Sequence, residues 1–214
     1  MPAQIKMISA FSSFTASAKA LRTIQQNDLP KIAPDKRVLG VIRPTTEVVG
    51  QYSKTRKVGV LATNGTVQSN SYEIEIEKFY PDIEVTQEAC PMWVPLVENN
   101  EYESHGADFF IKKNIHQLLK QEPLIDTILL ACTHYPLLLK KITEYTPVDI
   151  TILTQGAIVA NSLVDYLHRH PEMETRLTKN GNRTFYTTDA ATDFDKHAAR
   201  FYGKQVASKH IDLD

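Results

Sequence analysis

The stretch Ile125-Asp-Thr-Ile-Leu-Leu-Ala-Cys-Thr-His-Tyr-Pro-Leu-Leu138 decides how the rest of the chain is interpreted. An apolar run of strand length ends at Cys132, and apolar residues then recur at helical spacing. We therefore expect a buried strand over 128–131 that leads into a helix, with Pro136 in the first helical turn. Because open α/β sheets bind ligands at the carboxyl ends of their strands, Cys132 lies at a candidate site.

Cys132 has two interpretations. As a functional group, a thiol beside a helix N-terminus would have its pKa lowered, because the positive end of the helix dipole favours the thiolate. Thr133 would then add a hydroxyl donor, and His134 a group that exchanges protons near neutral pH. As a structural residue, Cys132 would be a buried cysteine next to a capping threonine, since cysteine is among the most buried residue types. This stretch alone leaves both interpretations open.

Composition narrows the class of protein. The 214 residues suffice for one large or two small domains, and the formal charge of −1 argues against a nucleic-acid or anionic-membrane partner. No apolar run approaches the roughly 18 residues of a membrane span, and residues 1–7 lack the apolar core of a secretory signal. We expect a cytoplasmic protein in which Cys90 and Cys132 are free thiols.

Strands and helices alternate along the chain, which predicts an α/β fold with parallel sheets and right-handed crossovers. Residues 90–98 contain two prolines and are expected to form a loop. A weak similarity between residues 7–15 and 128–134, each followed by a helix, suggests two similar domains facing each other across a cleft. The expected strands cover 38–42, 57–63, 82–87, 128–131, 149–153, 183–187 and 205–213, and the expected helices cover 15–24, 44–54, 67–79, 108–121, 156–168 and 192–201.

Two other kinds of site are disfavoured. A thiol hydrolase would usually draw its nucleophile and base from distant segments, whereas Cys132 and His134 are two residues apart, and no G-x-S-x-G elbow is present. Zinc requires three or four ligands at characteristic spacing, but Cys132-x-His134 and His168-x-His170 are only pairs.

Several segments in combination resemble bacterial glutamate racemases, from about Thr15 to the end of the chain. The histidine after Cys132-Thr133 favours these enzymes over their aspartate-racemase relatives, which usually carry Glu there. The resembling segments are Val38-Leu-Gly-Val-Ile-x-Pro44, Gly59-Val-Leu-Ala-Thr-Asn-Gly-Thr-Val-Gln-Ser69, Cys90-Pro-Met-Trp-Val-Pro-Leu-Val-Glu98, Leu129-Leu-Ala-Cys-Thr-His-Tyr-Pro-Leu-Leu138 and Phe185-Tyr-Thr-Thr-Asp189.

The resemblance implies an isomerase that interconverts L- and D-glutamate for peptidoglycan synthesis, and hence for cell-wall biogenesis and cell shape. The implied enzyme uses two catalytic cysteines, and it needs no pyridoxal or other cofactor and no metal. The implied fold has two flavodoxin-like, three-layer domains with the active site between them. Residues 1–37 plus 153–214 would form an incomplete first domain and residues 38–152 the second. Glutamate is the implied partner, and the resemblance allows a homodimer.

The resemblance also assigns site residues. Cys132 would be the second catalytic cysteine, His134 its proton partner and Glu98 an assisting carboxylate, whereas Cys90 would be structural. The residues expected to contact substrate are Thr15, Thr63, Thr66, Thr133 and His134.

The first family motif departs from its pattern here. The family has A-C-N-T-A-S-A, whereas residues 12–18 read Ser-Ser-Phe-Thr-Ala-Ser-Ala. Ser13 thus stands at the first cysteine position, and Phe14 replaces a substrate-binding asparagine. A hydroxyl is a far poorer acid–base group than a thiol, whose free pKa is about 8.5. We expect impaired racemisation.

The family's leading Asp-Ser-Gly strand also has no counterpart in this sequence, and we expect a frameshift or displaced start to explain its absence. The alternatives are a catalytically inactive remnant or amino-acid-binding α/β scaffold, and one-way chemistry by Cys132 alone.

Overall fold

The computed structural model describes residues 23–34, 39–177, 179, 181 and 183–212. The chain divides into two compact units, one of residues 1–9 with 166–214 and the other of residues 10–165. The expected domains, 1–37 with 153–214 and 38–152, have different boundaries and stay a prediction. The expected helix over 15–24 lies almost wholly outside the described residues.

The larger unit is built on a four-stranded sheet in which every pair of neighbours is parallel. Its strands are β1 (Lys57–Ala62), β2 (Glu84–Ala89), β3 (Thr127–Leu130) and β4 (Thr151–Thr154), in the order β2-β1-β3-β4. This order is that of flavodoxin-like sheets, whose ligand site lies where the connections change direction, between β1 and β3. The predicted α/β class with a parallel sheet is confirmed.

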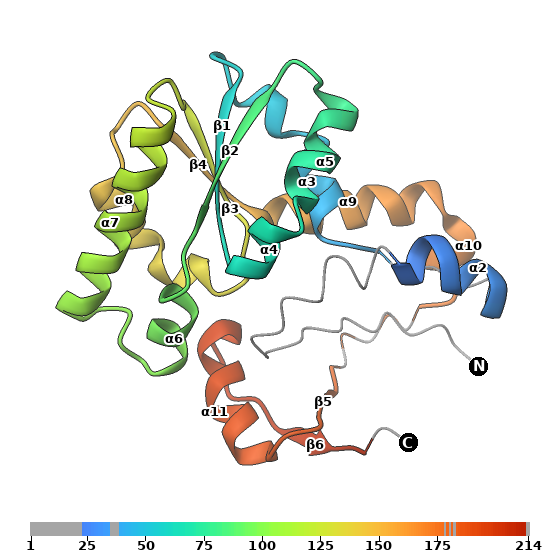
Figure 1. The fold of residues 1–214 in the computed structure, drawn as a ribbon. Helices are drawn as coiled ribbons and strands as arrows, with labels where there is room; N and C mark the ends of the chain where they lie inside the picture. The colour runs from blue at the N-terminus through green and yellow to red at the C-terminus, as the bar shows by residue number, and fades with distance from the viewer. Residues whose placement is uncertain (1–22, 35–38, 178, 180, 182, 213–214) are drawn as a thin grey trace. The chain divides into compact units, whose positions relative to one another are not determined.

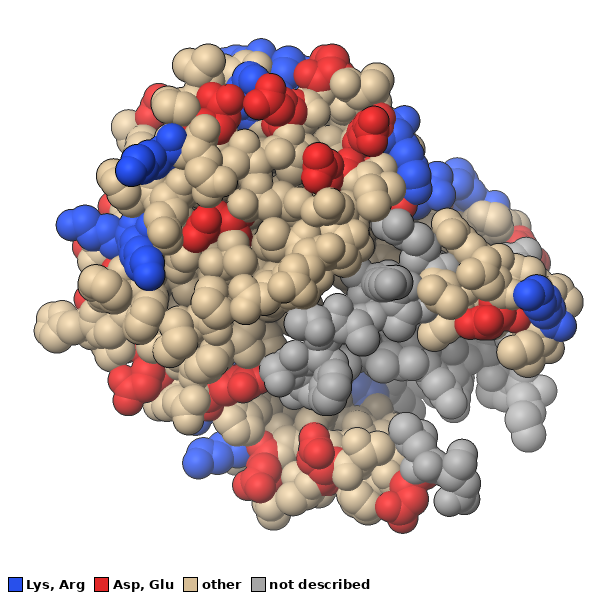
Figure 2. All heavy atoms as spheres, in the orientation of Figure 1, with Lys and Arg blue, Asp and Glu red and all other residues tan. Residues whose placement is uncertain are grey.

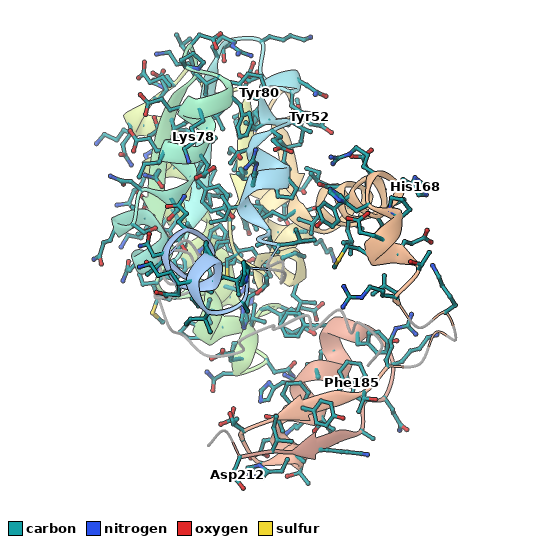
Figure 3. All side chains as sticks on the ribbon, turned by 90° about the vertical axis from the view of Figure 1, so that its right-hand side faces the viewer. Tyr52, Lys78, Tyr80, His168, Phe185 and Asp212 are labelled. Atoms are coloured by element: carbon teal, nitrogen blue, oxygen red, sulfur yellow. The ribbon has the colours of Figure 1, made fainter. Side chains whose placement is uncertain are left out.

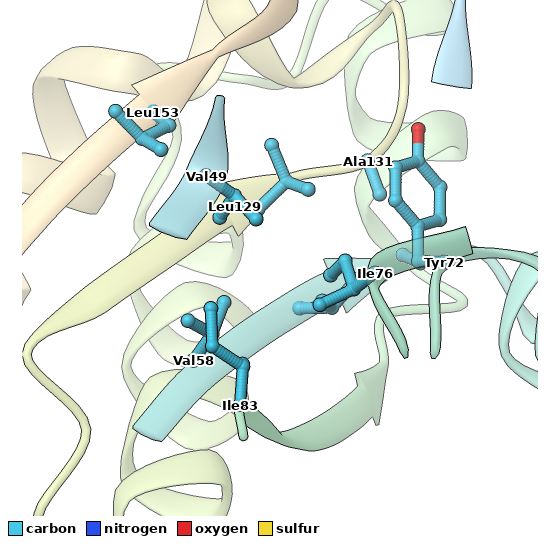
Figure 4. Close-up of a cluster of buried hydrophobic side chains, with 10 residues drawn as sticks. Val49, Val58, Tyr72, Ile76, Ile83, Leu129, Ala131 and Leu153 are labelled. Carbon is cyan, nitrogen blue, oxygen red and sulfur yellow. The ribbon is translucent and has the colours of Figure 1, made fainter. Parts of the chain in front are cut away.

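The two central strands are buried because both faces of the sheet are covered. On one face, a core cluster contains alternate residues of β1 and β3 together with side chains of α5 (Figure 4). On the other face, a Cβ at Gly59 would lie 2.7 Å from a methyl carbon of Leu118 on α7, so the helix packs directly on the backbone. A continuous apolar run is what burial on both faces requires.

The helices of this unit form the layers outside the sheet. Figure 1 shows α3 (Ile42–Thr46) and α5 (Ser71–Phe79) beside one face, and α7 (His105–Gln121) and α8 (Leu139–Tyr145) beside the other. The shorter elements are η1 (Ile24–Asp28), α2 (Leu29–Ile32), η2 (Val49–Gln51), α4 (Asn64–Gln68), α6 (Trp93–Glu98) and η3 (Tyr135–Leu138).

The expected strand over 38–42 was wrong in its described part, since residues 39–41 form no strand and α3 begins at Ile42. The expected helix over 44–54 is also shorter, because α3 ends at Thr46 and only the turn η2 follows. Pro44 falls in the first turn of α3, where its missing N–H loses no helical hydrogen bond.

The expected loop over 90–98 was wrong as well, because α6 spans Trp93–Glu98. Pro95 again lies in the first turn, where proline does not interrupt a helix. The expected continuous helix over 67–79 is divided into α4 and α5. The break lies at Asn70, whose φ of 49° is left-handed.

The smaller unit contains two short parallel strands, β5 (Phe185–Thr187) and β6 (Ser208–His210), joined through α11 (Ala191–Tyr202). Phe185, labelled in Figure 3, belongs to β5. Its ring packs edge-on against that of Tyr202, with ring centroids 5.5 Å apart. The turn α10 (Pro171–Glu174) also belongs to this unit, and α9 (Gln155–Arg169) spans the boundary between the units.

The surface drawn in Figure 2 carries acidic and basic side chains interspersed, with no large region of one sign. Within the described part of the chain, no helix has both the length and the apolarity to cross a membrane.

Candidate active site

Three strand ends place the candidate residues of the larger unit at one edge of the sheet. The last residues paired between β1 and β3 are Leu61 and Leu130. Thr63 and Cys132 each lie two residues further along the chain. On the other side of β1, the N–H of Cys90 donates to the carbonyl of Ala62 at 2.8 Å. Parallel pairing thus brings together residues separated by about 70 positions in sequence.

Cys132, His134 and Glu98 form a connected series of groups. The Sγ atom of Cys132 lies 3.8 Å from Nδ1 of His134, and Nε2 of the same imidazole lies 3.4 Å from Oε1 of Glu98. His134 is buried, whereas Glu98 is partly exposed. A thiol, an imidazole and a carboxylate in this order can move a proton and stabilise the imidazolium that results.

The thiol itself is not pre-ionised. The pKa of Cys132 is raised to about 11, chiefly because burial disfavours the charged thiolate. The backbone N–H groups of His134 and Tyr135 act in the opposite direction, and the charge of Glu98 adds to the rise. The expected lowering of this pKa was wrong, because the cost of burying the thiolate outweighs the N–H groups at the start of η3, which runs directly into α8.

Two of the expected substrate-contacting threonines lie together at the end of β1. The Oγ1 atoms of Thr63 and Thr66 are 3.1 Å apart, on either side of the start of α4. Thr133 is exposed beside Cys132. Ser13 and Thr15 lie outside the described residues. The roles assigned to all these residues stay predictions.

Cys90 occupies a different environment. Its side chain is fully buried and its pKa is raised well above the usual value, mainly by burial. The hydroxyl of Tyr135 donates to the Cys90 carbonyl at 3.4 Å, and the Tyr135 ring packs against Trp93 with centroids 4.8 Å apart. These contacts fit the structural role expected for Cys90.

Two side chains near the site were missed from the sequence. Gln155, the first residue of α9, donates from Nε2 to the hydroxyl of Tyr72 and to the carbonyl of Leu130. Gln155 comes directly after β4. Because ligands bind at the carboxyl ends of parallel strands, this position could have identified Gln155 from the sequence. Tyr72 lies within α5, and its sequence position alone gives no such signal.

The described residues contain no group of three or more His, Cys, Asp or Glu side chains able to hold a metal ion. The polar groups brought together at the strand ends are thiol, imidazole, carboxylate and hydroxyl. These groups suit acid–base chemistry on a small polar molecule.

Comparison with known proteins identifies the family. The sequence profile described as Asp/Glu/hydantoin racemase matches residues 8–161, which is more than half of the chain. This chain belongs to the Asp/Glu/hydantoin racemase family. Among its relatives is a glutamate racemase of Lactiplantibacillus plantarum, 37% identical over all of this chain and 75% of that protein. A glutamate racemase of Enterococcus faecalis is 36% identical over 94% of this chain and 70% of that protein.

Solved structures agree with this assignment. Glutamate racemase isoform RacE1 of Bacillus anthracis superimposes with a TM-score of 0.80, at 32% identity over 93% of this chain and 71% of that one. A glutamate racemase of Francisella tularensis, 22% identical, shares the fold with a TM-score of 0.77 over 97% of this chain and 85% of that one. The predicted resemblance to glutamate racemases within this racemase family is therefore confirmed.

Proposed function

We propose that this chain carries the glutamate-binding half-site of a cofactor-independent glutamate racemase, with Cys132 as the group that exchanges the α-proton. The observation that supports this most is the series Cys132–His134–Glu98 at the switch point of the sheet. Glutamate is proposed as the substrate because the sequence relatives are named glutamate racemases. By family, the product D-glutamate would serve peptidoglycan synthesis.

Before substrate binds, the thiol of Cys132 is protonated, because its pKa is about 11. As substrate binds, the thiol proton moves to Nδ1 of His134, and Glu98 stabilises the resulting imidazolium through Nε2. The thiolate then takes the α-proton of glutamate, which regenerates the thiol and leaves a carbanion. If the proton on sulfur is first replaced by one from solvent, its return from the same face restores the original enantiomer with its α-proton exchanged.

Inversion requires a proton donor on the opposite face of the α-carbon. The family resemblance assigns that position to Ser13, whose hydroxyl is a much weaker acid–base group near neutral pH than a cysteine thiol. We therefore propose that this chain exchanges the α-proton of one glutamate enantiomer while racemising slowly. The alternative, a binding scaffold with no chemistry, predicts no exchange at all.

Substrate carboxylates and the amino group need polar partners at the same edge. Thr63, Thr66 and Thr133 provide hydroxyl donors around the ends of β1 and β3. A cytoplasmic location suits the free thiols of Cys90 and Cys132, because that compartment keeps thiols reduced. A homodimer remains a prediction from the resemblance.

Calorimetric titration with D-glutamate, L-glutamate and L-aspartate tests the substrate assignment. We expect binding of glutamate, weakened about tenfold in Thr63→Val by the loss of a hydrogen bond to a charged group. Thr151→Val is the matched control, because Thr151 is exposed at the opposite end of β4. Absence of glutamate binding, or equal weakening in both variants, would contradict the proposal.

A further inference from the structure

A cavity of about 240 Å³ lies at the carboxyl end of β2. Its walls come from the last two residues of β2, from the loop over 91–92 and from one side of α7 over 110–117. Cys132, His134 and Glu98 are not among the described residues that line it. The volume is slightly below the roughly 300–1,000 Å³ of pockets for drug-sized ligands, so the cavity suits a smaller molecule.

Asn114 gives the inner wall a fixed hydrogen-bond acceptor. Its side chain lines the cavity and is only 5% exposed. Nδ2 donates to Oε1 of Glu88 at 2.8 Å and to the carbonyl of Ala89 at 3.2 Å. Both partners are acceptors, which determines the orientation of the amide and uses both of its hydrogens. The Oδ1 atom is left without a hydrogen-bond partner among the described residues, and so favours a donor from a ligand.

Glu88 adds a negative charge to the same wall. Its second oxygen, Oε2, accepts from Nε2 of Gln121 at 3.1 Å. The two amides hold the carboxylate in place, but they are neutral and do not balance its charge. Glu88 forms no ion pair with any described residue. A carboxylate has about four acceptor sites, so capacity for a charged donor remains.

The other walls are apolar apart from one exposed cation. Phe110 and Met92 line the cavity, and Met92 is 38% exposed. Lys113 also lines it, but this side chain is exposed, and dissolved salt screens its repulsion of a second cation. An ammonium group on an apolar body would be complementary to this combination, because an ammonium supplies donors and charge and is also attracted to an aromatic face.

We propose that this cavity binds a small primary amine with an apolar body. The ammonium group donates to Glu88 and to Oδ1 of Asn114, and the body contacts Met92 and Phe110. The inference goes beyond the proposed function and uses none of its residues. A ligand here would touch Met92, the residue before α6, whose last residue is Glu98.

NMR of the full chain with ¹³C-labelled methionine methyl groups tests the inference. The probes are 2-phenylethylamine, 2-phenylethanol and 3-phenylpropanoate, which share a phenyl body and are cationic, neutral and anionic at neutral pH. The chain has four methionines, and the Met92 resonance is identified by its loss in Met92→Leu. We expect the amine to shift this resonance and to bind at least about tenfold more tightly than the other two, as hydrogen bonds to a charged group do.

Glu88→Gln should weaken binding of the amine about tenfold and leave that of the alcohol unchanged, because only the charge is removed. Glu84→Gln is the matched control, since it makes the same change at the opposite end of β2 and should alter neither affinity.

The inference is overturned if the amine leaves the Met92 resonance unmoved, binds no more tightly than the alcohol or the anion, or binds Glu88→Gln as tightly as the unaltered protein. Should Glu88→Gln fail to fold, the comparison of the three probes on the unaltered protein decides. The measurement uses no glutamate, so its result is independent of the proposed function.

Discussion

Oε1 of Glu98 lies 3.4 Å from Nε2 of His134, the ring nitrogen that does not face the thiol of Cys132. The carboxylate therefore has two opposing effects on the proposed site. It stabilises an imidazolium at His134, which favours proton transfer from the thiol. Its negative charge also raises the pKa of the Cys132 thiol, which disfavours the thiolate.

Glu98→Gln separates these two effects. We expect alkylation of Cys132 to become roughly two- to fivefold faster, because one nearby negative charge is removed. We expect α-proton exchange from glutamate to become slower, because the imidazolium loses its partner. Glu101→Gln, a change on the exposed loop after α6, should alter neither rate. Changes in the same direction for both rates would contradict the assigned role.

Ser13→Cys should restore the missing acid–base group. Circular dichroism at fixed glutamate concentration should report racemisation increased by about 100-fold or more, the usual contribution of a positioned acid or base. Ser12→Cys introduces the same thiol one position away and serves as the control. If the two variants gave equal increases, the assignment of Ser13 to the first cysteine position would be wrong.

Gly50 is required by the close approach of an aromatic ring. A Cβ at this position would lie 2.4 Å from Cδ1 and Cε1 of Tyr80, whose hydroxyl is held by the Glu47 carbonyl. Gly50→Ala should lower the free energy of unfolding by about 1–3 kcal/mol, as overpacking does. Gly156→Ala, at a helical position with nothing within 4 Å, should leave it unchanged or raise it by up to about 1 kcal/mol. Urea denaturation measures both, and equal stability of the two variants would contradict the packing account.

Asp126 anchors the loop before β1 and gives stability a defined dependence on pH. Burial acts to raise the pKa of Asp126, but hydrogen bonds from the N–H groups of Thr55 and Lys54 and from the Thr127 hydroxyl outweigh it, and the pKa falls to about 2. The folded pKa is below the unfolded value, so the contribution is present above about pH 4 and is lost as the pH falls through 2.

Asp126→Asn should therefore lower the free energy of unfolding at neutral pH by roughly 1 kcal/mol, a figure reduced for screening by solvent. The difference between variant and unaltered protein should shrink as the pH falls from about 4 to 2. Asp149→Asn, an exposed carboxylate before β4, is the control. A difference that stays constant over this range would show that the charge of Asp126 is not responsible.

Continuous apolar strands could be predicted from sequence, whereas elements punctuated by proline or glycine could not. Residues 57–63 and 128–131 were expected as strands because burial on both faces leaves an unbroken apolar run. Pro95 made residues 90–98 look like a loop, although in the first turn of α6 it disrupts nothing. The apolar residues 39–42 suggested a strand, but the chain there turns into α3.

Some residues of the candidate site could likewise be predicted from the sequence, and others could not. Cys132 and His134 could be predicted because they follow a strand whose carboxyl end lies at the ligand-binding edge, whereas Thr63 was expected only from the family resemblance. Tyr72 could not, because its contact with Gln155 depends on how α5 and α9 pack, whereas the place of Gln155 directly after β4 could have pointed to it. The pKa of Cys132 was mispredicted because burial depends on the whole fold, whereas the helix-end argument used only the next few residues.

The most direct test of the central claim is exchange of the glutamate α-proton in D2O, followed by NMR for each enantiomer separately. We predict exchange of one enantiomer at a rate well above that of inversion, abolished in Cys132→Ser and retained in Cys90→Ser if the latter folds. Exchange that persists unchanged in Cys132→Ser, or no exchange of either enantiomer by the unaltered protein, would contradict the account.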